Sequence, residues 1–351
     1  MTDYLIVGLG LAGISFCEQL ESNGKSFYVV ADDSQQASLV AGGLYNPVIL
    51  KRFTMAWKAH EQMGLVDDFY TKLESKLGTK LDYKVPVLRR FASIEEQNMW
   101  FEAADKPVLN KYLSTDLKVN HNPEINAPFG YGEVLYTGRI DTKLLQSKYQ
   151  EFLEKNERFS KSSFDFESLE INEDSFRYQS RTYKKIVFAD GFGLKSNPFF
   201  NYLPLNGTKG ELLTIRAPKL TELNVIKSSV FIIPLGDDLY RIGATYKWKD
   251  KTNEPTEASK NELLEKLETF LKSDYEVVKH VAGVRPTVAD RRPLLGEHPT
   301  QKSLYTLNGF GSRGVLIAPY ASDYLYNFIE KGAQLPSEIN IERFKSAYKK
   351  A

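Results

Sequence analysis

The sequence feature that most constrains this fold lies near the N-terminus, where a short apolar run leads into a glycine-rich turn and a helix. Residues 3–7 (DYLIV) predict a strand, residues 8–13 read GLGLAG, and ISFCEQLES over 14–22 has a helical pattern. A strand, a G-x-G-x-x-G turn and a helix in this order form the phosphate-binding unit of dinucleotide folds. We therefore expect a dinucleotide to bind at the start of this helix.

Each glycine of the turn has a separate task in such a unit. Gly8 permits the tight turn, Gly10 lets a pyrophosphate approach the backbone, and Gly13 allows close packing of helix on strand. Leu11 and Ala12 complete the predicted loop. The first helical turn then offers free N–H groups to phosphate, so no charged side chain is needed there.

A second predicted strand, SFYVVADD over 26–33, ends in two acidic residues at the spacing expected for a ribose partner. Asp32 is our candidate for this partner, and Asp33 is the alternative. A carboxylate accepts hydrogen bonds from ribose hydroxyls but repels a 2′-phosphate. NADP is therefore the dinucleotide least expected at this site.

Composition excludes several classes of function. The chain has 46 Lys and Arg against 45 Asp and Glu, so no overall field draws it to DNA or an anionic membrane. No run approaches the roughly 20 apolar residues of a spanning helix, and the N-terminus leads directly into a strand, so we expect a cytoplasmic protein. The single cysteine, Cys17, is expected to be inert core, and the four scattered histidines predict no metal site.

The middle of the chain mixes helical and strand patterns. We expect the glycine-rich segment 41–53 to be a ligand-facing loop, and Asp141 or Thr142 to cap a helix. A GDD turn is expected inside a hairpin over 229–246. Further helices are predicted at 60–76, 94–104 and 257–273, and strands at 85–92 and between 164 and 215.

These alternations predict an α/β chain with two domains. One is a Rossmann-like cofactor domain with a mixed sheet, and the other is a substrate domain with an antiparallel sheet inserted into it. We expect the cofactor domain to comprise residues 1–80, 140–205 and 285–351. The substrate domain is expected to comprise residues 81–139 and 206–284.

Further segments resemble one family. ASLVAGGLYNP (37–47), GRIDTKLL (138–145) and KKIVFADGFG (184–193) are followed by GTKGELLTI, VFIIPLGDDLYRIGATY, AGVRPTVADRRPLLGEHP and NGFGSRGVLIAPYASDYLYNFI. In order and spacing they resemble the D-amino acid oxidase superfamily of FAD enzymes, and glycine oxidases most closely within it. The resemblance implies a glycine oxidase-like fold and changes the expected dinucleotide from NAD to non-covalent FAD.

The resemblance also implies the positions that contact FAD. GFGSRG opens a predicted helix, whose N-terminus offers N–H groups to the flavin edge. The positions that match the family are Ser38, Gly42 and Gly43 in the first segment, Ala189 and Gly191 in the third, and Gly311, Ser312, Gly314 and Val315 in the last.

For the reaction, the resemblance implies oxidation of a carbon–nitrogen bond in a small amino acid or secondary amine, with hydride passing to flavin N5. Arg285 in AGVRP matches the arginine that binds the substrate carboxylate, a task that a planar guanidinium performs well. Phe231 stands where glycine oxidases have a tyrosine, and Tyr246 is our candidate for the missing hydroxyl. Glycine oxidases have an arginine at the position that aligns with Ser312. The arginine of this chain, Arg313, lies one residue after that position.

Two alternatives stay open. GFGSRG also resembles the FAD domain of the bifunctional tRNA protein that matures 5-methylaminomethyl-uridine, whose substrate is an N-substituted glycine on RNA. The balanced charge and the lack of a methyltransferase segment favour a small-molecule amine over tRNA as the partner. The other alternative is a flavin-binding protein without turnover, which rests on Phe231.

Overall fold

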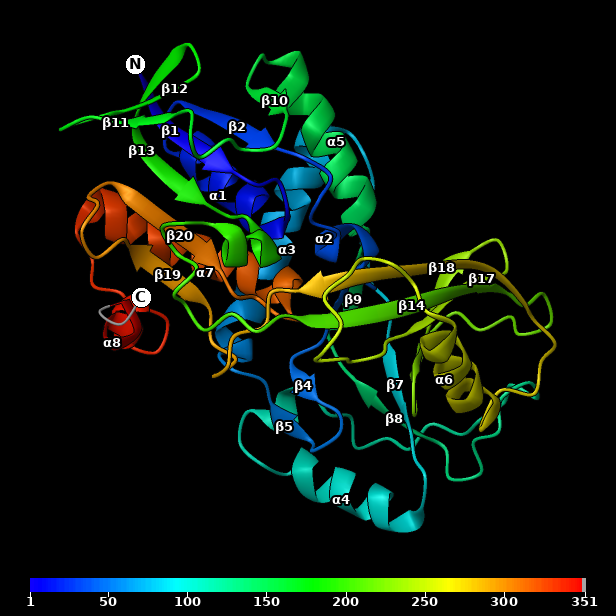
Figure 1. The fold of residues 1–351 in the computed structure, drawn as a ribbon. Helices are drawn as coiled ribbons and strands as arrows, with labels where there is room; N and C mark the ends of the chain where they lie inside the picture. Colours follow the sequence, from blue (N-terminus) through cyan, green and yellow to red (C-terminus); the bar gives the residue numbers. More distant parts are fainter. Residues whose placement is uncertain (349–351) are drawn as a thin grey trace.

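The computed structural model describes residues 1–348, and its strands form two large sheets with helices packed around them (Figure 1). In the first sheet β1 lies between β2 and β13, β10 extends the β2 side, and β20 runs parallel to β13. β11, β12 and β19 add antiparallel pairs. The bounds are β1 Thr2–Val7, β2 Phe27–Ala31, β10 Phe159–Lys161, β11 Leu169–Ile171, β12 Phe176–Tyr178, β13 Arg181–Phe188, β19 Leu294–Glu297 and β20 Leu304–Asn308.

The first sheet is covered on both faces, as the apolar β1 requires. Tyr4 and Ile6 pack into a core cluster with α1 (Leu11–Ser22) and α7 (Gly314–Lys331), whereas Leu5 and Val7 pack into a separate cluster on the other side. Alternate residues of a strand point to opposite faces, so a run without polar residues must be buried on both. α3 (Ala59–Leu77) and α5 (Thr142–Lys155) complete the helical layer.

The second sheet has seven strands in the order β18-β14-β17-β16-β15-β7-β8 and is antiparallel except between β15 and β7. Leu263 and Leu267 of α6 (Glu257–Glu268) pack on one face of this sheet beside Leu213 and Ile215 of β14. The bounds are β7 Val87–Arg90, β8 Tyr131–Val134, β14 Thr208–Arg216, β15 Val225–Lys227, β16 Phe231–Gly236, β17 Leu239–Gly243 and β18 Glu276–Arg285.

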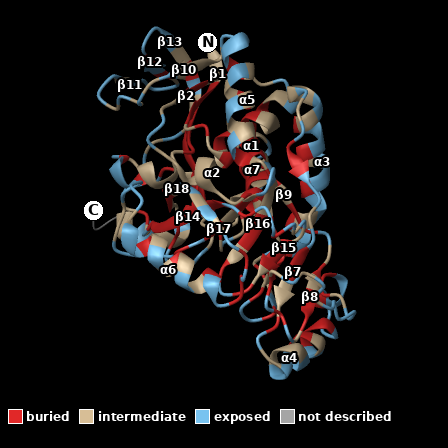
Figure 2. Cartoon of the chain, turned by 90° about the vertical axis from the view of Figure 1, so that its right-hand side faces the viewer, coloured by how far each residue is buried: buried red, intermediate tan, exposed pale blue. Residues whose placement is uncertain are grey.

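Short elements join the two sheets. α2 (Ala37–Val40) contacts both α5 and β18, and α4 (Ile94–Ala104) lies at the far end of the second sheet. The remaining elements are β3 Leu44–Tyr45, β4 Val48–Ile49, β5 Thr54–Met55, β6 Asp82–Tyr83, β9 Gly138–Ile140, α8 Lys345–Tyr348 and the 3-10 helices Leu109–Lys111, Gly191–Ser196 and Ile341–Phe344. Figure 2 shows buried residues along β14, β16 and α7, with exposed residues on α5 and α6.

The expected α/β class with a mixed sheet is confirmed, and local features differ from expectation at two places. Segment 41–53, expected to be irregular, contains the short strands β3 and β4, because β3 pairs with β9 and β4 with β5. The helix expected over 257–273 ends at Glu268, since Leu271 pairs with Ile125 instead. The division into two domains at the stated boundaries stays a prediction.

Asp141, one of the two candidate caps, accepts a hydrogen bond from the backbone N–H of Leu144 at 3.0 Å and thereby caps α5. The GDD turn lies between β16 and β17 as expected, with its three residues in left-handed conformations. Within residues 1–348, no helix has the length and apolar character to cross a membrane.

Candidate active site

A cavity of about 700 Å³ lies between the two sheets and receives side chains and backbone from both. It falls within the range of volumes typical of small-molecule and cofactor sites. Of the residues expected to contact the cofactor, all except Gly13 and Asp33 line it: Gly8, Gly10, Leu11, Ala12, Asp32, Ser38, Gly42, Gly43, Ala189, Gly191, Gly311, Ser312, Gly314 and Val315. Arg285 and Tyr246 line the same cavity, so the fold brings the proposed cofactor and substrate residues together.

The glycine-rich turn is shaped by contacts that leave no room for a side chain. Gly8 has φ +105°, and a Cβ there would lie 2.4 Å from the carbonyl oxygen of Ala189 at the end of β13. A Cβ on Gly13 would lie 2.1 Å from the carbonyl oxygen of Gly8. Gly13 therefore acts by packing α1 against the turn and does not line the cavity.

Two helices begin at the cavity without a side-chain cap. The N-cap residues Gly10 of α1 and Arg313 of α7 accept no hydrogen bond with their side chains. By contrast, Ser93 caps α4 and Thr256 caps α6. Uncapped N–H groups and the positive end of the helix dipole attract anions, so two anion-binding positions face one cavity.

The loop carrying α2 closes over the start of α1. The Ser38 hydroxyl accepts a hydrogen bond from the Leu11 N–H at 3.2 Å. Gly43, with φ +73°, lies so close to β9 that a Cβ would be 1.9 Å from the Ile140 carbonyl oxygen. This segment thus forms a wall made largely of backbone.

The two acidic residues after β2 have different surroundings. Asp32 lines the cavity and accepts hydrogen bonds from the hydroxyls of Ser34 and Ser163, both at 2.5 Å. Burial raises the pKa of Asp32, but these hydrogen bonds outweigh burial and hold the pKa below its usual value, so the carboxylate is ionised. Asp33 instead forms an ion pair with Lys161 at 2.7 Å.

Asp190, which the sequence analysis missed, is a second carboxyl in the cavity wall. It accepts hydrogen bonds from the side-chain amides of Asn197 at 3.0 Å and Asn308 at 2.9 Å. Burial raises the pKa of Asp190 to about 6, against the opposing effect of these hydrogen bonds. Asn308 is the last residue of β20, and Asp190 follows the end of β13. The hydrogen bond between them therefore connects the ends of the two strands beside the cavity.

Arg285 ends β18 and is buried against the backbone of β14. A Cβ on Gly210 would lie 1.9 Å from a guanidinium nitrogen of Arg285, so only glycine leaves room for this side chain. The guanidinium donates to the Thr245 carbonyl at 3.2 Å and lies 5.6 Å from the ring of Tyr246. Within the described chain, the Arg285 guanidinium has no carboxylate partner. Burial lowers the pKa of Arg285, and the nearby Tyr246 offsets part of this lowering.

Arg313 departs from the expected role. Its guanidinium donates to the carbonyls of Asn46 at 2.6 Å and Val48 at 3.5 Å and is not among the groups that line the cavity. Burial lowers the pKa of Arg313 to about 10. Because α7 begins at Gly314, Arg313 is positioned to join the helix start to the loop between β3 and β4.

Lys227, also missed, is a cation in the cavity wall at the end of β15. One sequence signal could have indicated that Lys227 points inward. Val225 and Lys227 alternate along this short strand, which places the lysine on the same face as a buried valine. Phe231 lies directly opposite Lys227 on β16 and also lines the cavity.

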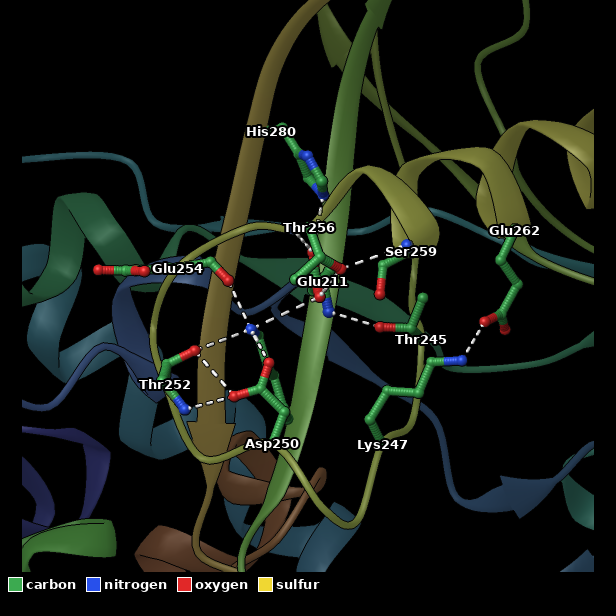
Figure 3. A network of polar contacts seen from close by, with 11 residues as sticks. Glu211, Thr245, Lys247, Asp250, Thr252, Glu254, Thr256, Ser259, Glu262 and His280 are labelled. Atoms are coloured by element: carbon green, nitrogen blue, oxygen red, sulfur yellow. Dashed lines mark hydrogen bonds and ion pairs between the residues drawn. The ribbon is translucent and has the colours of Figure 1, made fainter.

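A buried ionic network fixes the edge of the cavity (Figure 3). The fully buried ammonium of Lys209 on β14 contacts Asp250 at 2.5 Å and Thr252 at 3.0 Å. Glu211 accepts hydrogen bonds from the backbone N–H and hydroxyl of Thr256 at 2.7 and 2.9 Å. The segment after β17, which carries Tyr246, is thereby held against the second sheet.

The match to known families follows this geometry. The family model described as DAO, FAD dependent oxidoreductase, matches residues 3–327. The chain belongs to the DAO family of FAD-dependent oxidoreductases. Within residues 1–348, no group of three His, Cys, Asp or Glu side chains is placed to hold a metal ion.

Individual relatives are more distant. The tRNA 5-methylaminomethyl-2-thiouridine biosynthesis bifunctional protein of Aromatoleum aromaticum is 29% identical over 173 residues, which are 43% of this chain and 27% of that protein. Glycine oxidase of Bacillus subtilis is 28% identical over 134 residues, 36% of each chain. The alignments thus span about a third or less of these relatives. The structure of glycine oxidase from Bacillus cereus shares the fold, with a TM-score of 0.75, 22% identity and coverage of 95% and 96%.

The cavity of this DAO-family protein meets the chemical demands of FAD. The pyrophosphate requires N–H donors without steric obstruction, which the turn at Gly8 and the start of α1 offer. Asp32 is an ionised acceptor of the kind that ribose hydroxyls need, and the N-terminus of α7, which lacks a cap from its N-cap side chain, is the kind of donor group that a flavin edge needs. The remaining wall is mainly backbone and apolar side chains, as a planar ring system requires.

Proposed function

We propose that this protein uses non-covalently bound FAD to oxidise the carbon–nitrogen bond of a small amino acid or secondary amine that carries a carboxylate. The observation that carries the proposal is the Arg285 guanidinium, which lies half-buried in the cavity wall without an acidic partner among residues 1–348. A buried cation costs free energy unless an anion compensates it. A substrate carboxylate, bound through two parallel N–H···O contacts, is the anion whose shape matches a guanidinium.

The residues have distinct roles in this reaction. The turn at Gly8, Asp32 and the start of α7 would hold FAD, which when bound supplies the acceptor for the hydride that leaves the substrate carbon. Arg285 anchors the carboxylate, and Tyr246, beside it, offers a hydroxyl to the same group. Preorganised contacts of this kind orient the substrate carbon and require no added acid or base beyond a neutral substrate amine.

Non-covalent attachment is supported by what lines the cavity. Cys17 is fully buried within α1, and among residues 1–348 no histidine or cysteine belongs to the cavity wall. The side chains that most often link covalently to flavins are therefore remote. We expect acid precipitation of the purified protein to release all its flavin into the supernatant.

The direct test is an anaerobic visible spectrum of the purified protein before and after addition of glycine, sarcosine, D-alanine and D-proline in turn. Loss of the oxidised flavin band with any of them is the expected result and ranks the substrates. If the band persists with all four, these simple amines are not substrates, and larger amines that carry a carboxylate are tested next. A flavin that also resists modified tRNA would then favour a binding protein without turnover.

A second candidate function, oxidation of an N-substituted glycine on tRNA, is favoured by one observation. Tyr246, which lines the cavity, and Trp248 are 41% and 46% exposed, and their rings pack edge to face. Exposed aromatic rings are suitable for stacking an unpaired base, and Lys247 and Lys249 flank Trp248. Bleaching by carboxymethylaminomethyl-modified tRNA, with unmodified tRNA as control, would establish this function.

A further inference from the structure

Lys227 occupies an unusual position for a lysine in the second sheet. Its ammonium lies 4.5 Å from the centre of the Phe231 ring, on the cavity side of the sheet. Among residues 1–348, the ammonium has no hydrogen bond or ion pair, and burial lowers its pKa to about 8, with further lowering by Arg89 and Lys266. A cation–π contact contributes about 0.5–2 kcal/mol and satisfies none of the three N–H donors.

The acidic groups near Lys227 are already paired with other cations. Arg89, opposite Lys227 on β7, forms an ion pair with Glu96 and donates to the Ser228 carbonyl. Lys266 is paired with Glu262 at 2.6 Å. These pairs leave the Lys227 ammonium as a second uncompensated cation in the cavity wall, in addition to Arg285.

The register of the sheet places the two cations on one face. Lys227 pairs with Phe231, Phe231 with Gly243, and Gly243 with Leu212. Directly opposite residues of antiparallel strands share a face, and so do alternate residues along a strand. Leu212 therefore shares its face with Thr208, which pairs with Arg285 on β18.

The floor between the two cations is electrically neutral. Gly210, Leu212, Gly243, Phe231 and Ile233 line it, and none of them carries a charge. Arg285 lies on the edge strand β18, and Lys227 lies four strands away on β15. A ligand that neutralises both cations must therefore be elongated, with an anionic group at each end and an uncharged or weakly polar middle.

We propose that the substrate of this protein is a dicarboxylic amino acid, in which Arg285 binds the carboxylate next to the amine and Lys227 binds a second, distal carboxylate. This inference rests on the proposed function, because it takes the carboxylate site at Arg285 as given. It assigns Lys227 as the residue that selects diacids over monoacids. A neutral distal group of the same size would leave the Lys227 ammonium buried without an anion.

The test compares two probes that differ only in charge at the distal end. N-(3-carboxypropyl)glycine carries the second carboxylate, and N-(3-carbamoylpropyl)glycine replaces it with a neutral amide of nearly equal shape. Anaerobic rates of flavin reduction are measured for both probes with the wild-type holoenzyme and with Lys227→Met. Lys219→Met, which removes an exposed lysine paired with Asp274, is the matched control.

We expect the wild type to favour the acid over the amide by at least about tenfold in kcat/KM, through a lower KM. Lys227→Met should remove most of this preference while retaining FAD, and Lys219→Met should keep it. Equal rates for acid and amide in the wild type, or an unchanged preference in Lys227→Met, would overturn the assignment of Lys227 but not the oxidase proposal. Failure of both probes and of the four simple amines to reduce the flavin would instead overturn the oxidase proposal itself.

Discussion

The two ends of the cavity are built from different parts of the chain. At the end proposed to hold the dinucleotide, the wall is mostly backbone: the turn at Gly8, the starts of α1 and α7, and the wall at Gly43. At the substrate end they come from side chains on separate strands, chiefly Arg285 and Lys227. Backbone contacts depend on local conformation, whereas side-chain contacts depend on how distant strands are paired.

This difference has a consequence for what substitution does at each end. At the dinucleotide end, added atoms collide with a carbonyl, and the expected outcome is loss of folding or of FAD. At the substrate end, removed charges leave the sheet intact and change only which ligand binds. The following substitutions separate these two kinds of effect.

The largest effect is expected from Gly13→Ala. The added Cβ would lie 2.1 Å from the Gly8 carbonyl oxygen, so the turn and α1 must separate. We expect purified protein without FAD and a loss of unfolding free energy of about 3 kcal/mol, the upper part of the usual range for overpacking. Flavin absorbance and chemical denaturation measure the two effects.

Gly64→Ala is the matched control for this substitution. Gly64 is also helical, in α3, and a Cβ there has no neighbour within 4 Å. Alanine should stabilise the protein by about 0.5–1 kcal/mol through helix propensity, with full FAD. If both variants kept FAD equally, close packing at Gly13 would not be required for the cofactor.

The next largest effect is expected from Arg285→Ala, which removes the proposed carboxylate anchor. Loss of a buried, hydrogen-bonded charge pair typically costs about 2–5 kcal/mol, so kcat/KM for carboxylate substrates should fall by at least about thirtyfold. FAD content should stay at the wild-type level, because Arg285 is not at the dinucleotide end. Arg177→Ala, which removes an exposed arginine of β12 outside the cavity lining, is the control. Unchanged kinetics in Arg285→Ala would remove the anchor assignment.

The strand, turn and helix at the proposed dinucleotide end could be predicted from sequence because they are contiguous. GLGLAG places a strand end, a turn and a helix start within a few residues, and the acidic pair after β2 narrows the ribose partner to Asp32 or Asp33. The cap at Asp141 follows the same principle, since a side-chain oxygen and an N–H three residues later are local neighbours. Local geometry of this kind is encoded by short patterns.

The substrate end could be predicted only in part. Arg285 was found through a family resemblance. The alternation in β15 could indicate only which face Lys227 shares with Val225, whereas its place in the cavity wall depends on the pairing of β15 with both β7 and β16. For Arg313, the position in a motif gave no information on the direction of the side chain, and its role in the reaction stays a prediction. Its guanidinium contacts the carbonyls of Asn46 and Val48, residues more than 260 positions away in sequence.

A smaller effect, on the affinity for FAD, is expected from Asp32→Ala. This substitution tests how much one side chain contributes to binding at the proposed dinucleotide end. Loss of one charged hydrogen-bond acceptor should raise the Kd for FAD by about tenfold, since such bonds contribute about 1.5–3 kcal/mol. Asp33→Ala should bind FAD as the wild type does, because Asp33 is paired with Lys161 outside the cavity. Titration of apoprotein with FAD measures both. The reverse order of affinities would make Asp33 the ribose partner.

The smallest expected effect is the pH dependence of the preference for a distal carboxylate. Measuring it tests the role of Lys227 at the proposed substrate end most directly. The pKa of Lys227 is lowered to about 8 by burial and by Arg89 and Lys266. Below this pH the ammonium is charged and attracts the second carboxylate. Above it the amine is neutral, so KM for the acid probe should rise relative to KM for the amide probe.

The ratio of the two KM values isolates Lys227 from other titrations. The substrate amine and Arg285 affect both probes alike, and Arg89 and Lys266 are each held in an ion pair, with Glu96 and Glu262 respectively. With a pKa near 8, the charged fraction of Lys227 falls by about tenfold between pH 7 and pH 9, and the KM ratio should change by at most that factor. Lys227→Met should give a flat ratio. A wild-type ratio that is equally flat would place the distal carboxylate out of reach of Lys227.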